Sequence, residues 1–433
     1  MSARIRQNGE RKSAAAHSFK AGTKLGVQDA MFLRSQIKNV NLFSVQKQRY
    51  VILDALRGFA ILGIILANFP EFSLWTFSDP SSWTATDRVT RAIQTFLVDG
   101  KFYTLFSLLF GMGFSIQLTN AEGKLRTFYR RMAVLFIIGL LHLCLLWSGD
   151  ILMLYALCGM VLPLFRKLAT KKLLLCAGGF LILPVVLDAI FGTRLADPLE
   201  AEQWRICALY GITQENFGTW LSDATSYGEV LQFLHQGGIE RMWEFVIGHR
   251  FFKVLGLFMI GFAIGRNRIY ADINGNALLL KRILVYGLLL GIPIGVLYTW
   301  SSMAGYPFGR VSHSVFYLLS VYPMGFSYAA GFALLFNRCP EASGWKLLSN
   351  PGRMACTNYL GQSVIGIILF YGVGFALGNK VGLLGTELIA LGVYAFQIGF
   401  SSLWMGYFRF GPVEWIWRML TYGRRLEILK SRE

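Results

Sequence analysis

Residues 132–165 read MAVLFIIGLLHLCLLWSGDILMLYALCGMVLPLF, two apolar segments separated only by Ser148, Gly149 and Asp150. A helix needs about 20 mostly apolar residues to cross the hydrocarbon core of a bilayer. Each segment approaches that length, and the short polar break predicts a tight hairpin of two membrane-spanning helices. The sequence around this hairpin therefore predicts an all-α bundle in a membrane.

The rest of the chain has the composition of a polytopic membrane protein. Of its 433 residues 54% are hydrophobic and only 15% are charged, with a mean hydropathy of +0.48. Soluble domains carry about 25% charged residues. We expect about ten transmembrane helices, at residues 51–69, 102–119, 132–148, 150–165, 173–191, 251–266, 283–300, 314–336, 355–377 and 383–407.

The distribution of basic residues predicts how these helices are oriented. If the N-terminus is inside, the segments on the cytoplasmic side hold 31 Lys and Arg and the external segments hold 8. This asymmetry obeys the positive-inside rule at every crossing, so both termini are predicted to face the cytoplasm. The net charge of +18 follows from this topology. The sequence shows no basic stripe interleaved with aromatic residues, so nucleic-acid binding is not expected.

Three regions flank or interrupt the bundle, which we place at residues 49–422. Residues 1–48 contain no apolar signal segment and are predicted to be a disordered basic tail on the cytoplasmic side. The external segment 192–250 is too long for a simple turn, and the part at 227–244 is compatible with an interfacial helix. Residues 423–433 form a second basic cytoplasmic tail.

Two charged residues lie near the start of the first predicted helix. A charge near the centre of a spanning helix costs about 2.5–3.5 kcal/mol, so it needs a partner or a function. Asp54 and Arg57 are three residues apart and share a helical face, so they can neutralise each other. The pair is either a structural ion pair near the interface or an anion site that opens to the cytoplasm.

His142 is the one histidine that this topology places in the middle of the membrane. Histidine exchanges a proton near neutral pH, which makes His142 a candidate general base, with a satisfied core histidine as the alternative. Asp150 follows eight residues later, about 12 Å along a helix, so direct pairing requires the hairpin to fold back. Asn68, Asp99 and Lys101 also lie at the outer face, where Asp99 and Lys101 are able to pair with each other.

A second polar cluster opens the ninth predicted helix. Asn358 and Gln362 are four residues apart and share a face, and Arg353 precedes them at the cytoplasmic side. Buried amides in a bilayer either join helices or line a polar cavity. The six cysteines show no metal-binding spacing and are expected to be small packing residues, and no metal site is predicted.

Several of these motifs resemble those of the YeiB-like membrane proteins, a bacterial family of largely unassigned function. The resemblance covers residues 50–422, which implies the bacterial inner, or plasma, membrane. It rests on LDALRG at 53–58, FSLLFGMG at 106–113, WSGD at 147–150, GRMACTNYLGQS at 352–363 and GPVEWIWR at 411–418.

The first motif is also similar to that of the transmembrane acyltransferases, which include heparan-α-glucosaminide N-acetyltransferase. Those enzymes transfer an acyl group from cytoplasmic acyl-CoA to a sugar on the other side of the membrane. The resemblance maps Asn68 onto the asparagine that ends their first helix. Their catalytic histidine lies in the next external loop, whereas 70–93 contains no histidine here. His142 is then the histidine left for that role.

These observations favour an integral-membrane acyltransferase that moves an acyl group, expected to be acetyl, onto an extracytoplasmic hydroxyl or amine. Arg57 and Arg353 would hold the phosphates of acyl-CoA as a co-substrate, because Arg matches phosphate geometry. His142, with Asp150, would deprotonate a small-molecule or glycan acceptor, whose side of the site would also include Asn68, Asp99 and Lys101. Asn358 or Gln362 would donate to the developing oxyanion.

Other functions remain compatible with the same residues. A transporter or exporter of a small solute would use Asp54, Arg57 and His142 as a proton relay, although no inverted repeat is visible. A scaffold without chemistry is a third alternative. We expect no tightly bound cofactor, and a homodimer in the lipid bilayer is compatible with the sequence.

Overall fold

The computed structural model describes residues 50–119 and 125–430, so the predicted tail at 1–48 lies outside the described part. Within these ranges the fold is all-helical, apart from one isolated bridge between Phe408 and Leu429. In chain order the helices are α3 (Val51–Phe72), η1 (Trp75–Phe77), η2 (Pro80–Ser82), α4 (Ala85–Leu97), α5 (Lys101–Thr119), α6 (Leu125–Leu145), α7 (Leu152–Val161), η3 (Leu162–Phe165), α8 (Thr170–Phe191), α9 (Asp197–Tyr210), α10 (Trp220–Asp223), α11 (Tyr227–Ile247), α12 (Arg250–Arg266), η4 (Ile269–Ala271), α13 (Ala277–Met303), α14 (Gly309–Arg338), α15 (Gly344–Arg353), α16 (Ala355–Phe370), α17 (Leu383–Tyr407) and α18 (Pro412–Tyr422).

Each predicted span coincides with a helix, but length and composition qualify fewer of these helices as complete spans. Six helices are long and apolar enough to cross a bilayer within the described residues: α3, α6, α8, α13, α14 and α17. The pair α11 and α12 would add a seventh, although the two helices are bent by 64° relative to each other. Two apolar helices, Leu152–Phe165 and Ala355–Phe370, are shorter. The protein is therefore a multi-pass membrane protein with at least six candidate spans.

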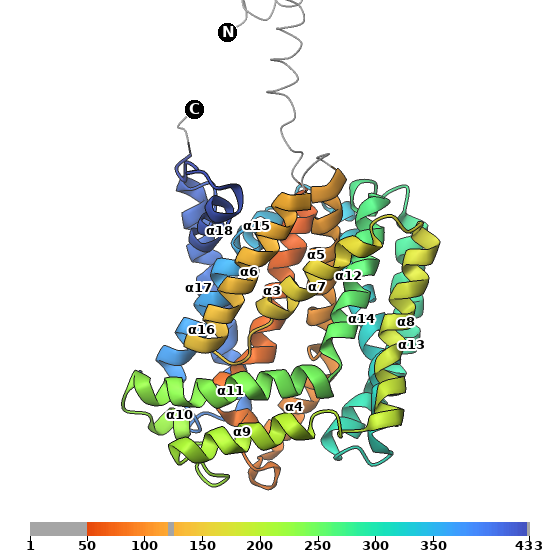
Figure 1. Ribbon diagram of the computed structural model, residues 1–433. Coiled ribbons are helices and arrows are strands. Elements are labelled where there is room, and N and C mark those ends of the chain that lie inside the picture. The colour runs from red at the N-terminus through yellow and green to blue at the C-terminus, as the bar shows by residue number, and fades with distance from the viewer. Residues whose placement is uncertain (1–49, 120–124, 431–433) are drawn as a thin grey trace, which may run out of the picture. The chain divides into compact units, whose positions relative to one another are not determined.

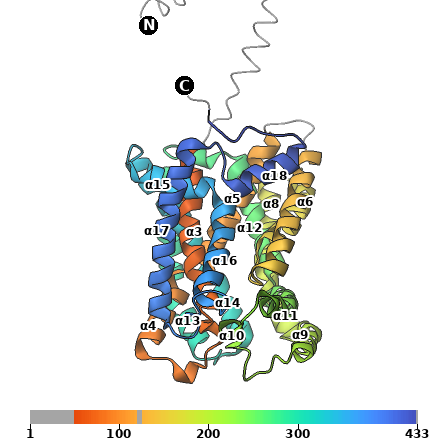
Figure 2. The ribbon, with the colours of Figure 1, turned by 90° about the vertical axis from the view of Figure 1, so that its left-hand side faces the viewer.

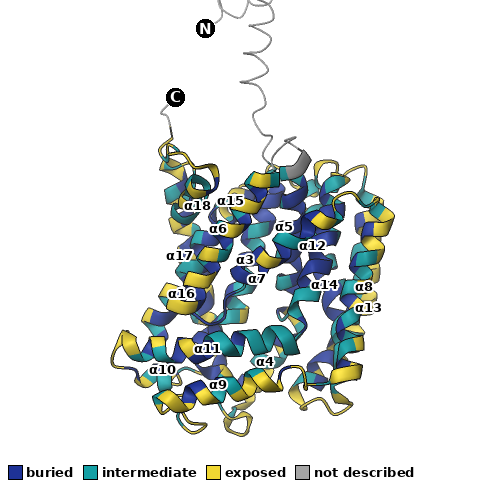
Figure 3. Ribbon diagram, viewed as in Figure 1, coloured by how far each residue is buried: buried dark blue, intermediate teal, exposed yellow. Residues whose placement is uncertain are grey.

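Figure 3 shows exposed residues along α8 and α13, and many of these exposed residues are apolar. In α13, only 11% of an 18-residue apolar stretch is buried inside the protein. Leu175 of α8, Leu289 of α13 and Leu403 of α17 are all exposed. A soluble protein rarely exposes contiguous apolar surface of this extent, whereas lipid tails match it.

Glycines allow two pairs of central helices to approach closely. A Cβ added to Gly58 of α3 would lie 1.9 Å from the carbonyl oxygen of Leu348 in α15. A Cβ at Gly111 of α5 would lie 2.1 Å from the carbonyl oxygen of Phe258 in α12. Small residues at such contacts let transmembrane helices pack closely.

Shorter helices lie at the two ends of the bundle. α15 and α18 lie at one end, and α4, α9, α10 and α11 lie at the opposite end (Figures 1 and 2). α11 crosses that end at a steep angle to the bundle helices (Figure 1), and it includes the segment 227–244 that was expected to be helical. The functional site described below lies near this end.

Candidate functional site

A cavity of about 480 Å³ lies between the helices at the end that carries α11. This volume is within the range of small-molecule sites. Its wall is rich in charged and aromatic side chains, which is unusual for the interior of a membrane bundle. The polar and aromatic residues that line it are Asn68, Glu71, Asp99, Phe102, Tyr103, Phe106, Trp147, Tyr155, Asp188, Arg241, Glu244, Arg250, Lys253, Tyr298, Tyr306, Arg310, His313, Ser314, Tyr317 and Tyr359.

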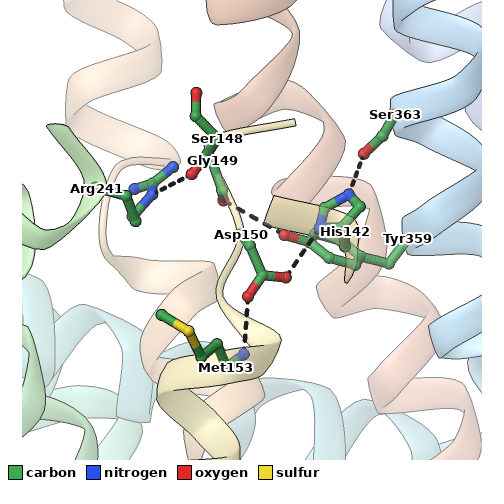
Figure 4. A network of polar contacts seen from close by, with 8 residues as sticks. All are labelled: His142, Ser148, Gly149, Asp150, Met153, Arg241, Tyr359 and Ser363. Atoms are coloured by element: carbon green, nitrogen blue, oxygen red, sulfur yellow. Dashed lines mark hydrogen bonds and ion pairs between the residues drawn. The ribbon is translucent and has the colours of Figure 1, made fainter. Parts of the chain in front are cut away.

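Beside the cavity, His142 is the centre of a buried polar network (Figure 4). Its Nδ1 lies 2.9 Å from Oδ1 of Asp150, and its Nε2 lies 2.8 Å from the hydroxyl oxygen of Ser363. The second oxygen of Asp150 accepts a hydrogen bond from the backbone N–H of Met153 at 2.8 Å. His142, Asp150 and Ser363 are each at most 2% exposed.

Direct pairing of His142 with Asp150, which was not relied on because it requires the hairpin to fold back, is present in the structure, and Gly139 provides the physical reason. α6 ends at Leu145, and the chain turns back before α7 begins at Leu152. A Cβ on Gly139 would lie 2.4 Å from the backbone nitrogen of Met153. Because glycine has no Cβ, the start of α7 packs against α6 one turn before His142, which brings Asp150 to the imidazole.

The network fixes the chemical role of each ring nitrogen. A carboxylate only accepts hydrogen bonds, so the Nδ1–H of His142 donates to Asp150. Nε2 is then the acceptor for the hydroxyl of Ser363. A histidine oriented by a carboxylate and in contact with a hydroxyl is the arrangement that activates an oxygen nucleophile.

Two aromatic residues separate His142 from the cavity. The ring centroid of Tyr359 lies 5.2 Å and that of Trp147 lies 6.1 Å from the imidazole, and both residues line the cavity. Trp147 donates its indole N–H to Glu71 at 2.9 Å. Arg241 holds the same turn by donating to the carbonyl oxygen of Ser148 at 2.7 Å (Figure 4). His142 is therefore one aromatic layer away from the cavity.

The residues expected at the outer face are only partly brought together. Asn68 and Asp99 both line the cavity. Lys101 is fully buried, and its ammonium donates to the carbonyl oxygen of Thr95 at 2.7 Å. Asp99 pairs with Arg91 at 3.2 Å, so the simple alternative of an Asp99–Lys101 pair is replaced by a pair with α4.

The structure contains the expected pair at the start of α3. Nη1 of Arg57 lies 2.9 Å from Oδ1 of Asp54, and the Arg57 side chain is 29% exposed. Asp54 is buried. Arg353 is the last residue of α15, the helix that packs against α3 through Gly58. Both arginines therefore belong to helices that are in direct contact.

The two amides of α16 connect it to α17. The amide nitrogen of Gln362 donates to the side-chain oxygen of Gln397 at 3.0 Å. That of Asn358 donates to the hydroxyl of Ser401 at 3.0 Å and to the carbonyl oxygen of Pro351 at 3.2 Å. These contacts correspond to the helix-joining alternative. Asn358 thus uses both of its amide N–H groups, whereas Gln362 uses one of its two.

Sequence reasoning missed several residues of the site. Asp188 and Lys253 lie inside predicted spans, so the rule that selected Asp54 and Arg57 would also have found them. Glu71 lies three residues after Asn68 and shares its helical face. His313 lies in α14, a candidate span, so His142 is not alone among the histidines of these helices. Ser363 had no sequence signal of its own, because its pairing with His142 depends on the fold.

Comparison with known proteins supports the sequence resemblance. Residues 264–424 match the family described as Protein of unknown function (DUF418). Residues 49–219 match the catalytic region of heparan-α-glucosaminide N-acetyltransferase. The segment between the two matches contributes Arg241, Arg250 and Lys253 to the cavity wall.

Relatives align along nearly the whole chain. Uncharacterized protein YxaH of Bacillus subtilis is 30% identical over 88% of this chain and 96% of its own length. An uncharacterized 39.9 kDa protein of Bacillus acidopullulyticus is 32% identical over 89% of this chain and 97% of its own. Uncharacterized protein YeiB of Escherichia coli is 30% identical over 86% of this chain and 96% of its own. The chain therefore belongs to the DUF418, or YeiB-like, family of membrane proteins.

Proposed function

We propose that this protein is an integral-membrane acyltransferase that transfers an acyl group, acetyl in the simplest case, from cytoplasmic acyl-CoA to an extracytoplasmic hydroxyl or amine. The observation that carries the proposal is the match of residues 49–219 to an acetyltransferase catalytic region. That range contains His142 and Asp150, whose buried pair supplies an oriented base.

In the proposed reaction His142 acts through Nε2. This nitrogen removes the proton from the acceptor hydroxyl or amine while Asp150 stabilises the resulting imidazolium. The acceptor atom attacks the thioester carbonyl carbon, the C–S bond breaks, and the departing thiolate takes the proton from the imidazolium. Because Ser363 contacts Nε2, the acceptor either displaces its hydroxyl or transfers its proton through it.

Access of substrate to His142 is the step that needs movement. Tyr359 and Trp147 separate the imidazole from the cavity. A change in the side-chain conformations of these two residues would connect the 480 Å³ cavity with Nε2 of His142. Asn68 and Asp99 on the cavity wall would contact the acceptor, and Asp150 acts only through His142.

Arg57 and Arg353 are proposed to hold the phosphates of acyl-CoA from the other end of the bundle. The Arg57 side chain is 29% exposed while it pairs with Asp54. Arginine forms bidentate hydrogen bonds with phosphate oxygens, which a pair of such residues on adjacent helices would exploit.

Together with this reaction we propose ten spans in a bacterial inner membrane, with both termini in the cytoplasm. The placement of α15 and α18 at one end and of α9–α11 at the other supports this arrangement (Figure 1). The segments expected in the cytoplasm carry 31 of the Lys and Arg residues. Shorter helices such as α7 and α16 would complete their crossings with the turns that flank them.

The test is thioester turnover by the purified protein in proteoliposomes. Labelled acetyl-CoA is added on the side to which α15 is exposed, with a bacterial envelope extract as the source of acceptor. We expect release of free thiol and transfer of label to an extract component. If neither is seen with acyl-CoA of any chain length, while the liposomes take up or release a solute, the protein is a transporter and the proposal is wrong.

A further inference from the structure

One wall of the cavity carries three cationic side chains on two helices. Arg250 and Lys253 are three residues apart on α12, so they share a face. Arg310 lies in the first turn of α14. All three line the cavity, and the other residues of α12 and α14 are largely apolar. The wall formed by α12 and α14 is therefore the most cationic part of the site.

The carboxylates nearby are already bonded to other groups. Asp188 accepts hydrogen bonds from Arg310 Nε at 2.8 Å and from His249 Nε2 at 3.1 Å. It also accepts one from the hydroxyl of Ser314. Glu244 pairs closely with Arg241 and lies 3.6 Å from Arg250. Each of these acids serves several donors at once.

The remaining acids of the cavity are bonded elsewhere. Asp99 pairs with Arg91 at 3.2 Å. Glu71 accepts a hydrogen bond from the indole of Trp147 at 2.9 Å. Neither of these two contacts involves the α12–α14 wall.

Lys253 is the cation without an acidic partner. Among the residues that the structure describes, no carboxylate lies within 4.0 Å of its ammonium group. The ammonium lies 4.2 Å from the ring centroid of Tyr317. A cation in a partly buried aromatic environment is costly unless an anion completes it. Lys253 therefore lines the cavity without an anionic partner among the described residues.

Aromatic side chains border the same wall. The imidazole of His313 lies 4.8 Å from the ring of Tyr298 and 4.2 Å from that of Tyr306. Rings with hydroxyl groups provide flat faces and hydrogen bonds for a small polar molecule. A ligand bound there would have its anion at Lys253 and its body along these rings.

We propose that Lys253, together with Arg250 and Arg310, binds the phosphate group of a phosphate ester, and that the acyl acceptor is such an ester. The second half of this inference rests on the proposed acyltransferase function. Lys253 supplies the charge without an acidic partner, and Arg250 and Arg310, which line the same cavity, can add hydrogen bonds to the oxygens of a phosphate monoester. The ester is either a soluble metabolite or a lipid that ends in a phosphate monoester, such as phosphatidic acid, since both present the same doubly charged group.

The experiment measures binding of glycerol 3-phosphate to the purified protein in maltoside detergent by calorimetry, with glycerol as the neutral comparison. We expect saturable binding of the phosphate ester and none of glycerol. Lys253→Gln should weaken binding by about tenfold or more, because a hydrogen bond to a charged group is lost. Lys253→Arg should retain most of it. Lys380→Gln, an exposed lysine at the same end of the bundle, should bind like wild type.

Two results would overturn the inference: equal affinity of wild type and Lys253→Gln, or displacement of glycerol 3-phosphate by coenzyme A, which would assign the wall to the donor. Arg250→Gln repeats the test if Lys253→Gln does not fold. Native mass spectrometry with phosphatidic acid identifies a lipid source through Lys253-dependent retention. Lys253-dependent binding without thioester turnover would keep the phosphate site and reject the acyltransferase. Thioester turnover without phosphate binding would keep the acyltransferase and reject the phosphate site.

Discussion

Nδ1 of His142 lies 2.9 Å from Oδ1 of Asp150, although a straight helix would separate these residues by about 12 Å. The turn between α6 and α7 removes this separation, and Arg241 of α11 holds the turn through the carbonyl oxygen of Ser148. Ser363 of α16 contacts the other ring nitrogen of His142. The α6–α7 turn, α11 and α16 are distant in sequence, and together they determine the orientation of this imidazole. Such multiple support is what a catalytic base requires to keep one tautomer.

We expect His142→Gln to reduce thioester turnover by about 10²–10⁴-fold, the usual contribution of a general base. Glutamine keeps a polar side chain of similar size but cannot take up the acceptor proton. The measurement is thiol release per folded protein, with thermal stability recorded on the same sample.

The control for this prediction is His235→Gln. His235 is exposed on α11 and hydrogen-bonded to Tyr210 at 2.8 Å, away from the network. This variant should retain wild-type turnover. If His142→Gln keeps full turnover and only melts at a lower temperature, His142 is a structural residue and the catalytic assignment fails.

Gly139→Ala tests whether close helix approach creates the His142–Asp150 pair. The added Cβ would lie 2.4 Å from the backbone nitrogen of Met153 and 3.0 Å from Oδ2 of Asp150. Because one neighbour is backbone, α7 must shift, at a cost of about 1–3 kcal/mol. We expect a lower melting temperature and a turnover loss approaching that of His142→Gln.

The matched comparison is Gly178→Ala in α8, where an added Cβ meets no atom within 4 Å. Alanine is the better helix former, so this variant should be as stable as wild type or slightly more stable. Equal melting temperatures and equal activities for the two alanine variants would show that α6 and α7 do not need this glycine.

The helices themselves were predictable, because a long apolar segment in a membrane has few other ways to hydrogen-bond its backbone groups. All ten predicted segments coincide with helices, and the segment at 227–244 is helical as expected. The number of complete spans was harder to predict. α7 and α16 are short, and α11 and α12 form a bent pair, so hydropathy alone cannot count crossings when helices break inside a bundle.

The site was predictable only where its residues are neighbours in the chain. The Asp54–Arg57 pair follows from helical spacing and is present at 2.9 Å. Contacts between distant segments, such as His142 with Ser363, arise from packing that spacing does not encode. Asp188 and Lys253 were visible as charges in predicted spans, and they were missed because only some of those charges were considered.

Labelling of single cysteines tests the predicted topology. Ser226 and Ser343 are both exposed, the first before α11 and the second before α15, at opposite ends of the bundle (Figure 1). In a background without the native cysteines, Ser226→Cys should react with an impermeant thiol reagent added outside intact spheroplasts. Ser343→Cys should react only after the membrane is opened. Reaction at the opposite side for either position would overturn the arrangement with both termini inside.

Glu414 is predicted to stabilise the start of α16, the helix that carries Ser363. Its Oε1 accepts hydrogen bonds from the backbone N–H groups of Cys356 at 2.7 Å and Thr357 at 3.0 Å. Its Oε2 accepts one from the Thr357 hydroxyl at 2.6 Å. These N–H groups have no partners within the first turn of α16, and a carboxylate also complements the helix dipole there. Glu414 thus caps α16 from a separate helix, α18.

Glu414→Ala should therefore destabilise the protein by about 1–3 kcal/mol, since it leaves buried N–H groups without acceptors. Glu414→Gln retains one acceptor oxygen without the charge, so its loss should be intermediate. Unfolding of a membrane protein is often irreversible, so the comparison uses melting temperature and half-life at one fixed temperature. Glu427→Gln is the control, because its side chain is 85% exposed at the same end of the chain. If Glu414→Ala survives heating as long as Glu427→Gln, α18 does not cap α16, and the position of Ser363 beside His142 must depend on the packing of α16 against its other neighbours, such as α3 and α17.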